Sequence, residues 1–122
     1  MNDDTLLLRQ VHPTWIQSGR VTSQVFKPTP KDQQCLSVYN GDQITPADSW
    51  RHFTENLGCQ SVGVLSVSVA ECRQLNLNAR PDPGPFPEHA VIDFGQHRGA
   101  QLEAKAKQLR ALAVQRGWQY QV

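Results

Sequence analysis

The stretch SVGVLSVSV, residues 61–69, decides how this chain folds. Successive side chains of a strand point to opposite faces, and apolar residues here fall on both faces, which is typical of a central strand covered on two sides. The segment SVAE at 68–71 has the spacing of a capping box, so we expect a short helix to follow as far as about Leu75.

Three runs before this strand also have β character. Residues 5–9 (TLLLR) are apolar, residues 20–26 (RVTSQVF) are rich in β-branched side chains, and residues 35–39 (CLSVY) end at an Asn-Gly turn signal. Short, turn-rich segments separate these runs. We therefore expect three strands that pair antiparallel.

A helix with clear end signals is predicted over residues 46–57. Thr45 is a good N-cap, and Pro46 suits the first helical position. Gly58 stands where a glycine ends a helix. Apolar residues recur between these signals at helical spacing, namely Trp50, Phe53 and Leu57.

The second half alternates between strand and helix patterns. A proline-rich loop at 78–88 precedes a strand at 89–94, a helix is predicted over 101–116, and residues 118–122 alternate as a final strand. The expected fold is α+β, a single domain over residues 1–122. Its mixed β-sheet is covered by helices in the order β-β-β-α-β-α-β-α-β, with parallel crossovers in the second half. The expected core comprises Trp50, Phe53, Leu57, Val64, Leu65, Val67, Val91, Ile92, Leu102 and Leu109.

Composition narrows the class of protein without identifying it. The chain has 122 residues and a net charge of +1, which does not favour nucleic-acid binding, and it lacks a long apolar run or a secretion signal. We expect a cytoplasmic protein that does not enter a membrane. Its three cysteines lack the spacing of a zinc site, so no metal or cofactor is expected, and Cys35 and Cys72 are interpreted as small buried apolar residues.

The densest set of polar residues lies in the first third of the chain, and short catalytic motifs such as GxSxG and HExxH are absent. Arginine, histidine and serine side chains close to strand ends can bind a phosphate or carboxylate and exchange a proton near neutral pH. The alternative is ordinary ion pairing with Asp3, Asp4 or Asp32 at strand edges. The set comprises Arg9, His12, Arg20, Ser23, Asp32 and Ser37.

His89 joins this set because it begins a strand directly after the proline-rich loop, where active-site groups are common. The candidate catalytic residues are therefore His12, Ser23 and His89, and the candidate ligand-binding residues are Arg9, Arg20 and Ser37. The loop at 81–87 (PDPGPFP) is interpreted as a lid tipped by Phe86, a rigid crossover, or a segment that presents itself to an aromatic groove. His52 and His97 are interpreted as solvated.

Three segments resemble a group of small bacterial proteins of unknown function: residues 9–38, 86–94 and 106–118. The resemblance implies a compact, stand-alone bacterial domain. The chain is also faintly similar to NAD-dependent ADP-ribosyltransferase-like folds, in which an arginine or histidine on the first strand and a serine on a later strand hold the dinucleotide. That likeness implies such roles for Arg9 or His12 and for Ser23 or Ser37. The glutamate that those enzymes often use has no clear counterpart in this sequence, in which Glu71 and Glu88 are the candidates.

Two classes of function remain open. The first is a cytoplasmic binding or accessory domain with a protein partner, for example one member of a bacterial two-protein conflict or defence system. In that case exposed residues such as Trp15 and Phe86 would carry the function. The second is a small enzyme that uses a nucleotide or another small anionic ligand, with one pocket built from the polar set.

Overall fold

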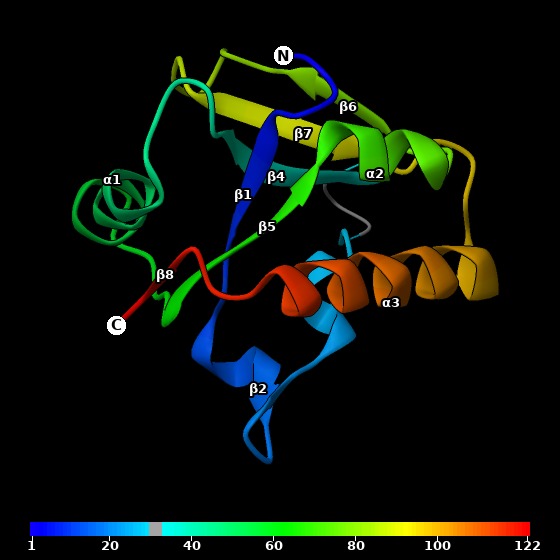
Figure 1. Ribbon diagram of the computed structural model, residues 1–122, viewed down its shortest axis with the longest axis horizontal. Helices are drawn as coiled ribbons and strands as arrows, with labels where there is room; N and C mark the ends of the chain where they lie inside the picture. The colour runs from blue at the N-terminus through cyan, green and yellow to red at the C-terminus, as the bar shows by residue number, and fades with distance from the viewer. Residues whose placement is uncertain (30–32) are drawn as a thin grey trace.

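A computed structural model describes residues 1–29 and 33–122 (Figure 1). The chain forms one six-stranded sheet and a separate two-stranded hairpin, β2 (Ile16–Gln17) and β3 (Arg20–Val21). The strands of the large sheet, in their spatial order, are β6 (Asn78–Pro81), β7 (His89–Asp93), β4 (Cys35–Asn40), β1 (Leu6–Gln10), β5 (Gly63–Ser68) and β8 (Tyr120–Gln121).

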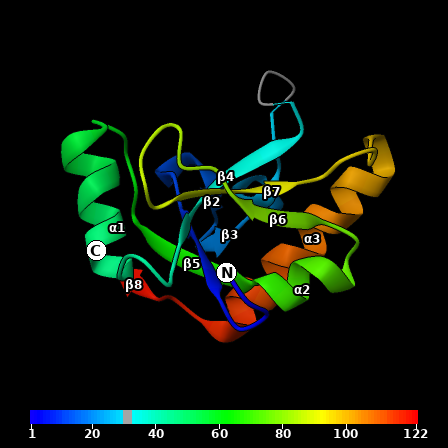
Figure 2. The same ribbon diagram turned by 90° about the horizontal axis from the view of Figure 1, so that it is seen from above.

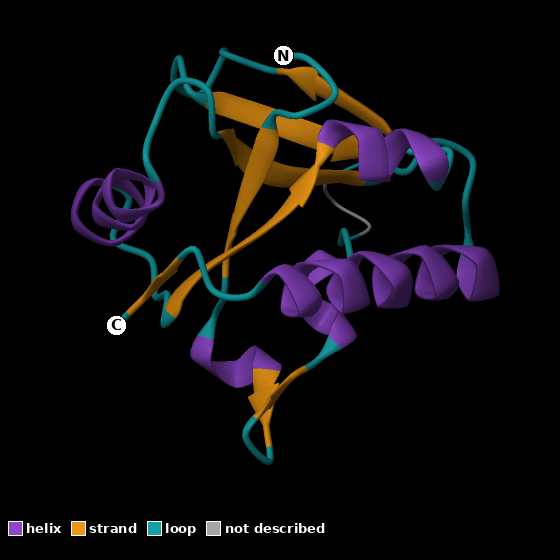
Figure 3. Ribbon diagram, in the orientation of Figure 1, coloured by secondary structure: helices purple, strands orange, loops and turns teal. Residues whose placement is uncertain are grey.

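Helices cover both faces of this sheet (Figures 2 and 3). On one side lies α1 (Pro46–Arg51), which continues as the π-helix η4 (His52–Asn56). On the other side lie α2 (Val69–Gln74), α3 (Gly99–Arg116) and the 3₁₀ turn η2 (Ser23–Phe26), while a second 3₁₀ turn, η1 (Pro13–Trp15), follows β1. None of the described helices is long and apolar enough to cross a membrane.

Successive side chains of β1 point to opposite faces of the sheet, and the apolar side chains accordingly form two clusters. Leu7 belongs to the larger cluster under α2, α3 and η2, whereas Leu8 belongs to a smaller cluster with Tyr39 and Val64, against which Trp50 and Phe53 pack. The α+β class predicted from the sequence is therefore confirmed, with the long α3 helix and the buried β5 strand supplying much of the larger cluster.

The predicted helix ends are also confirmed. The Thr45 side chain accepts a hydrogen bond from the Asp48 N–H, and Ser68 forms a complete capping box with Glu71. Gly117 ends α3 with a φ of 94°, a conformation that L side chains rarely adopt.

The expectation of parallel strand pairs is wrong, because every strand pair in the described residues is antiparallel. The helix-containing connection from β4 to β5 does join strands of like direction, since each of them runs antiparallel to β1. However, β1 lies between these two strands and separates them. The sequence pattern thus predicts that β4 and β5 run in the same direction, but it does not predict that β1 lies between them.

The predicted strand over residues 20–26 is wrong after its second residue. A strand would place Val25 and Phe26 on opposite faces, yet both are fully buried on the same side of the sheet. The 3₁₀ turn η2 brings both side chains into the larger cluster against α3.

Leu57 is the one predicted core residue that is largely exposed, at 47%. An α-helix would bring it onto the stripe of Trp50 and Phe53. The π-helix η4 carries more residues per turn, so it rotates Leu57 away from that stripe.

Strand β6 lies inside the segment predicted to be a proline-rich loop. It pairs with β7 at the edge of the sheet, with Pro81 opposite Ala90 as its last pair. An edge strand tolerates proline because one of its sides needs no hydrogen-bond donors, which explains why composition conceals this strand.

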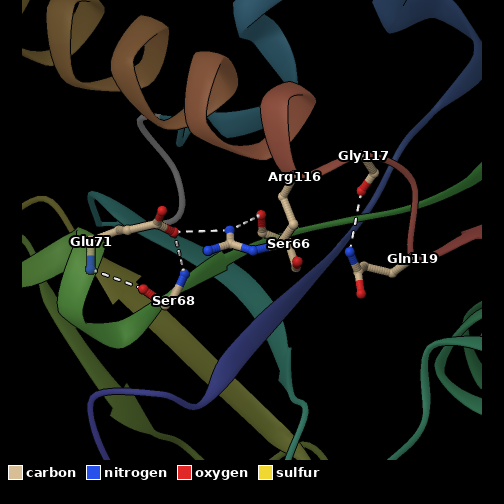
Figure 4. Close-up of polar contacts among 6 residues, drawn as sticks. All are labelled: Ser66, Ser68, Glu71, Arg116, Gly117 and Gln119. Atoms are coloured by element: carbon tan, nitrogen blue, oxygen red, sulfur yellow. Dashed lines mark hydrogen bonds and ion pairs between the residues drawn. The ribbon is translucent and has the colours of Figure 1, made fainter.

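A polar network joins the end of α3 to the start of α2 (Figure 4). Arg116 Nη1 donates to the Ser66 carbonyl at 3.0 Å and to Glu71 Oε1 at 2.9 Å, and Glu71 also accepts from the Ser68 N–H at 2.7 Å. Partial burial alone would raise the pKa of Glu71, but the hydrogen bonds from Arg116 and Ser68 outweigh burial and lower this pKa below its ordinary value.

Leu109→Ala should lower the free energy of unfolding by about 2–5 kcal/mol, because Leu109 is fully buried between α3 and the sheet and its truncation leaves a cavity. Val114→Ala on the same helix is the matched control, since Val114 is 44% exposed. Urea denaturation measures both changes. Equal losses for the two variants would contradict the placement of Leu109.

The Glu71–Arg116 pair should make stability depend on pH. Because folding lowers the pKa of Glu71 from 4.5, its contribution is present above that pH and is lost as the pH falls through the folded-state pKa. Wild type should therefore exceed Glu71→Gln in free energy of unfolding at pH 7, and this gap should shrink below about pH 4.5. Denaturation across pH measures the gap. A difference in free energy of unfolding that stays constant across pH would contradict the stabilising role of the ionised Glu71.

Candidate functional site

The pairing between β1 and β4 stops early, and this opens the sheet. It comprises Leu7 with Asn40 and Leu8 with Tyr39, after which the two strands separate. Arg9 bridges the separation: its Nη1 donates to the Ser37 carbonyl at 2.9 Å and its Nε to the Val25 carbonyl at 2.7 Å. The guanidinium therefore makes hydrogen bonds where the ladder no longer does.

A pocket of about 290 Å³ lies beside this separation; we call it the aromatic pocket. The sheet provides its floor, the end of the α1–η4 helix provides one wall, and the loop between β6 and β7 provides another. This size lies near the lower end of small-molecule sites. The residues that line it are Leu8, Arg9, Gln10, Ser37, Val38, Tyr39, Phe53, Leu57, Pro85, Phe86 and His89.

The floor of the aromatic pocket holds a serine–histidine pair. His89 is only 7% exposed, and its Nε2 lies 3.1 Å from the Ser37 hydroxyl. Its Nδ1 lies 2.8 Å from the Asp82 carbonyl oxygen and 3.3 Å from the Asp82 carboxylate. Since a carbonyl oxygen only accepts hydrogen bonds, Nδ1 carries a proton, and the tautomer with its single proton there leaves Nε2 to accept from the Ser37 hydroxyl.

β4 and β7 place these two side chains together. Tyr39 faces His89 and Ser37 faces Val91 in the antiparallel register, so Ser37 and His89 are diagonal neighbours on one face. The Ser37 side chain is exposed to the pocket, whereas the His89 ring is buried beneath it. A hydroxyl that is accessible and contacts a histidine base is the arrangement required for nucleophilic catalysis.

Phe86 forms the aromatic wall of the pocket. Its ring lies 5.1 Å from Tyr39, 4.6 Å from His52 and 5.1 Å from His89, measured between ring centroids. The loop between β6 and β7 therefore lines one side of the pocket with its apolar tip, Phe86. Desolvation by burial is the main cause that raises the pKa of Tyr39 well above its ordinary value, so this phenol stays neutral.

The interpretation of His52 as a solvated residue is wrong. Its Nδ1 lies 2.8 Å from the Tyr39 hydroxyl, and its ring packs against Phe86. Asp48, which lies one helical turn before His52, forms an ion pair with Arg51. His52 therefore joins α1 and η4 to the wall of the pocket.

The structure divides the predicted polar set between two places. Arg9, Ser37 and His89 line the aromatic pocket, whereas Arg20 and Ser23 line a groove between the β2–β3 hairpin and α3. Asp32 lies outside the described residues. Five of the residues that the sequence places around one pocket thus lie in two separate clusters.

His12 contributes to neither cluster in the described residues. Its Nδ1 accepts from the Thr14 N–H at 3.1 Å, which makes His12 the N-cap of η1, and its ring packs 5.8 Å from Trp15. Asp3, an expected partner for the strand-edge arginines, forms its ion pair with Arg73.

Asp82 and Tyr39 are the residues of the site that the sequence does not indicate. Asp82 reaches His89 only because β6 and β7 form a hairpin, in which Pro81 lies opposite Ala90. A prediction of residues 78–81 as a strand would have indicated that Asp82 lies beside His89. Glu71, one counterpart of the ADP-ribosyltransferase glutamate, lies instead in the α2–α3 network, and Glu88 does not line the pocket.

Groups of three or more potential metal ligands are absent from the described part of the chain. Cys72 is buried as predicted, Cys35 is half-buried with its Sγ 3.8 Å from Arg80 Nη2, and Cys59 is exposed. Burial, with a smaller effect from the charge of Glu71, raises the pKa of the Cys72 thiol to about 12.

A thiol reagent at pH 8 should therefore modify Cys59 rapidly and Cys72 very slowly in the native protein, because the thiolate is the reacting species. All three cysteines should react once denaturant is added. Absorbance of the released thiol counts them. Rapid native reaction of Cys72, located by mass spectrometry, would contradict its burial.

Comparison with protein-family models, with curated proteins and with solved structures finds no match.

Proposed function

We propose that this protein binds a small, mainly apolar ester in the aromatic pocket and hydrolyses it through Ser37. One observation carries the proposal: the Ser37 hydroxyl lies 3.1 Å from the Nε2 of a buried histidine whose other ring nitrogen is held by Asp82. A histidine fixed in this tautomer can accept the serine proton, which is the general requirement for a serine nucleophile.

The reaction follows from these contacts. The Ser37 oxygen attacks the ester carbonyl while its proton passes to His89 Nε2, and the C–O bond to the alcohol breaks as His89 returns the proton to the leaving oxygen. Water then attacks the acyl-serine with His89 again as base. The Ser37 proton is restored and the carboxylic acid leaves.

Arg9 supports the same chemistry by its charge. It is the only permanently charged residue among the described residues that line the aromatic pocket, and its Nη1 lies 2.9 Å from the Ser37 carbonyl oxygen. A positive charge beside the nucleophile favours the oxyanion that develops in acyl transfer.

The side chains that line the aromatic pocket indicate the class of substrate that it would bind. Leu8, Phe53, Leu57 and Phe86 present apolar surface, and the volume of about 290 Å³ suits a short acyl group better than a large cofactor. The proposed substrate is therefore an ester with a short aliphatic or aromatic acyl chain.

A second candidate is an ADP-ribosyltransferase-like reaction on NAD. Its support is that Arg9 on the first strand and Ser37 on a later strand line one pocket. No acidic residue lines this pocket within residues 1–29 and 33–122, which favours the hydrolase. A cytoplasmic location and a protein partner stay predictions from the sequence.

Hydrolysis of p-nitrophenyl butyrate tests the proposal. Ser37→Ala and His89→Gln should each lower kcat by at least about a hundredfold with little change in KM, because they remove the nucleophile and the base. Asp82→Asn should cost less, since the Asp82 backbone carbonyl still holds Nδ1. Release of p-nitrophenol measures each rate.

Ser23→Ala is the matched control, because Ser23 lies in the other cluster. It should hydrolyse the ester at the wild-type rate. Thermal denaturation of each variant shows whether it is folded. A folded Ser37→Ala variant with wild-type activity would overturn the hydrolase, whereas release of nicotinamide from NAD, lost in Arg9→Met, would support the second candidate.

A further inference from the structure

The second polar cluster lies where the β2–β3 hairpin folds against α3. Ser18 and Gly19 form the hairpin turn with φ values of 52° and 75°, and this tight turn directs Arg20 toward the helix. Arg110 on α3 donates from Nε to the Val21 carbonyl at 2.7 Å, which ties the two elements together. The contact fixes the spacing between hairpin and helix.

Two hollows meet at this contact, and they share Arg20, Val21 and Arg110. The first, which we call the cationic groove, has a volume of about 510 Å³ and is lined by Gln17, Ser18, Arg20, Val21, Thr22, Ser23, Lys107 and Arg110. This lining combines three cationic residues with three residues that carry a hydroxyl group. Such a set of donors suits a phosphate, sulfonate or carboxylate.

Within residues 1–29 and 33–122, these three cations, namely Arg20, Lys107 and Arg110, form no ion pair with an acidic side chain. Glu103, one turn before Lys107 on α3, pairs with Lys27, and its pKa is lowered mainly by Lys27 and to a lesser extent by Lys107. No acidic side chain is among the described residues that line either hollow.

The second hollow, which we call the apolar hollow, is larger and differs in chemistry. It measures about 620 Å³, and Ile16, Val62 and Trp118 provide much of its wall. Val114 on α3 also lines it and is 44% exposed, although it lies on the same helix as the buried core residues. An apolar wall and a basic groove thus lie side by side.

We propose that these two hollows form one binding site for a small amphipathic organic anion. Its charged head would lie in the cationic groove between Arg20, Lys107 and Ser23, and its aliphatic or aromatic body would cover Trp118 and Val114. This site is separate from the aromatic pocket and does not depend on the proposed hydrolase.

Charge complementarity and shape favour this occupant over a macromolecule. Three cationic residues at one groove match a single anionic group, whereas nucleic acid requires a broad basic face with stacked aromatic side chains. The volumes are those of small-molecule sites. An anionic membrane surface is the competing source of the same chemistry, and the experiment distinguishes the two.

Calorimetric titration of the whole protein with decanoate, below its micelle-forming concentration, tests the site. Wild type should bind decanoate, and added NaCl should weaken binding because the contact is partly electrostatic. Arg20→Gln and Lys107→Gln should each raise Kd by about tenfold or more, as loss of a charged hydrogen bond does. Both side chains are exposed, so folding should be preserved.

Lys105→Gln is the matched control, since it removes the same charge from the same helix but lines neither hollow. It should bind as wild type does. Inorganic phosphate should bind much more weakly than decanoate, because it lacks an apolar body. Equal Kd values for Lys107→Gln and Lys105→Gln would overturn the proposal. Binding to phosphatidylglycerol vesicles without binding of free decanoate would also overturn it, in favour of a membrane surface.

Discussion

The separation of β1 from β4 after two residue pairs is the constraint on which the rest of the structure depends. Two strands that diverge inside a sheet leave backbone groups to be satisfied, and the guanidinium of Arg9 provides donors for two carbonyls on two different segments. Each such charged hydrogen bond contributes about 1.5–3 kcal/mol. Trp15 lies over the guanidinium, 5.0 Å from ring centroid to Cζ, and holds it in place.

The separation also explains why the two candidate sites differ. On the face that α1 and η4 cover, Ser37 is exposed at a pocket because β1 no longer pairs with it, and the β6–β7 loop closes over the opening. On the other face, η2 packs against α3. The β2–β3 hairpin, which precedes η2 in the chain, also lies beside α3. One side thus offers a serine hydroxyl beside a buried histidine in an apolar pocket, and the other offers cations beside an apolar wall.

Local chemistry made much of the fold predictable. Thr45, Ser68 and Gly117 act at helix ends through contacts within a few residues, so their roles follow from the sequence. The strand interpretation of residues 20–26 failed because burial against α3 outweighed β propensity. The sequence does not indicate Asp82, because Asp82 contacts His89 only through the β6–β7 hairpin, and the proline in the edge strand β6 conceals that strand. His89 and Ser37 were each identified as candidates, but their contact depends on the register between β4 and β7.

The proposed hydrolase requires that His89 activate the Ser37 hydroxyl. Labelling of the native protein with a fluorophosphonate, followed by mass spectrometry of the peptides, measures this most directly, because the reagent modifies activated serines. We expect one modification, at Ser37, that disappears in a folded His89→Gln variant and in denatured wild type. Absence of label from Ser37, or equal labelling of native and denatured protein, would contradict it.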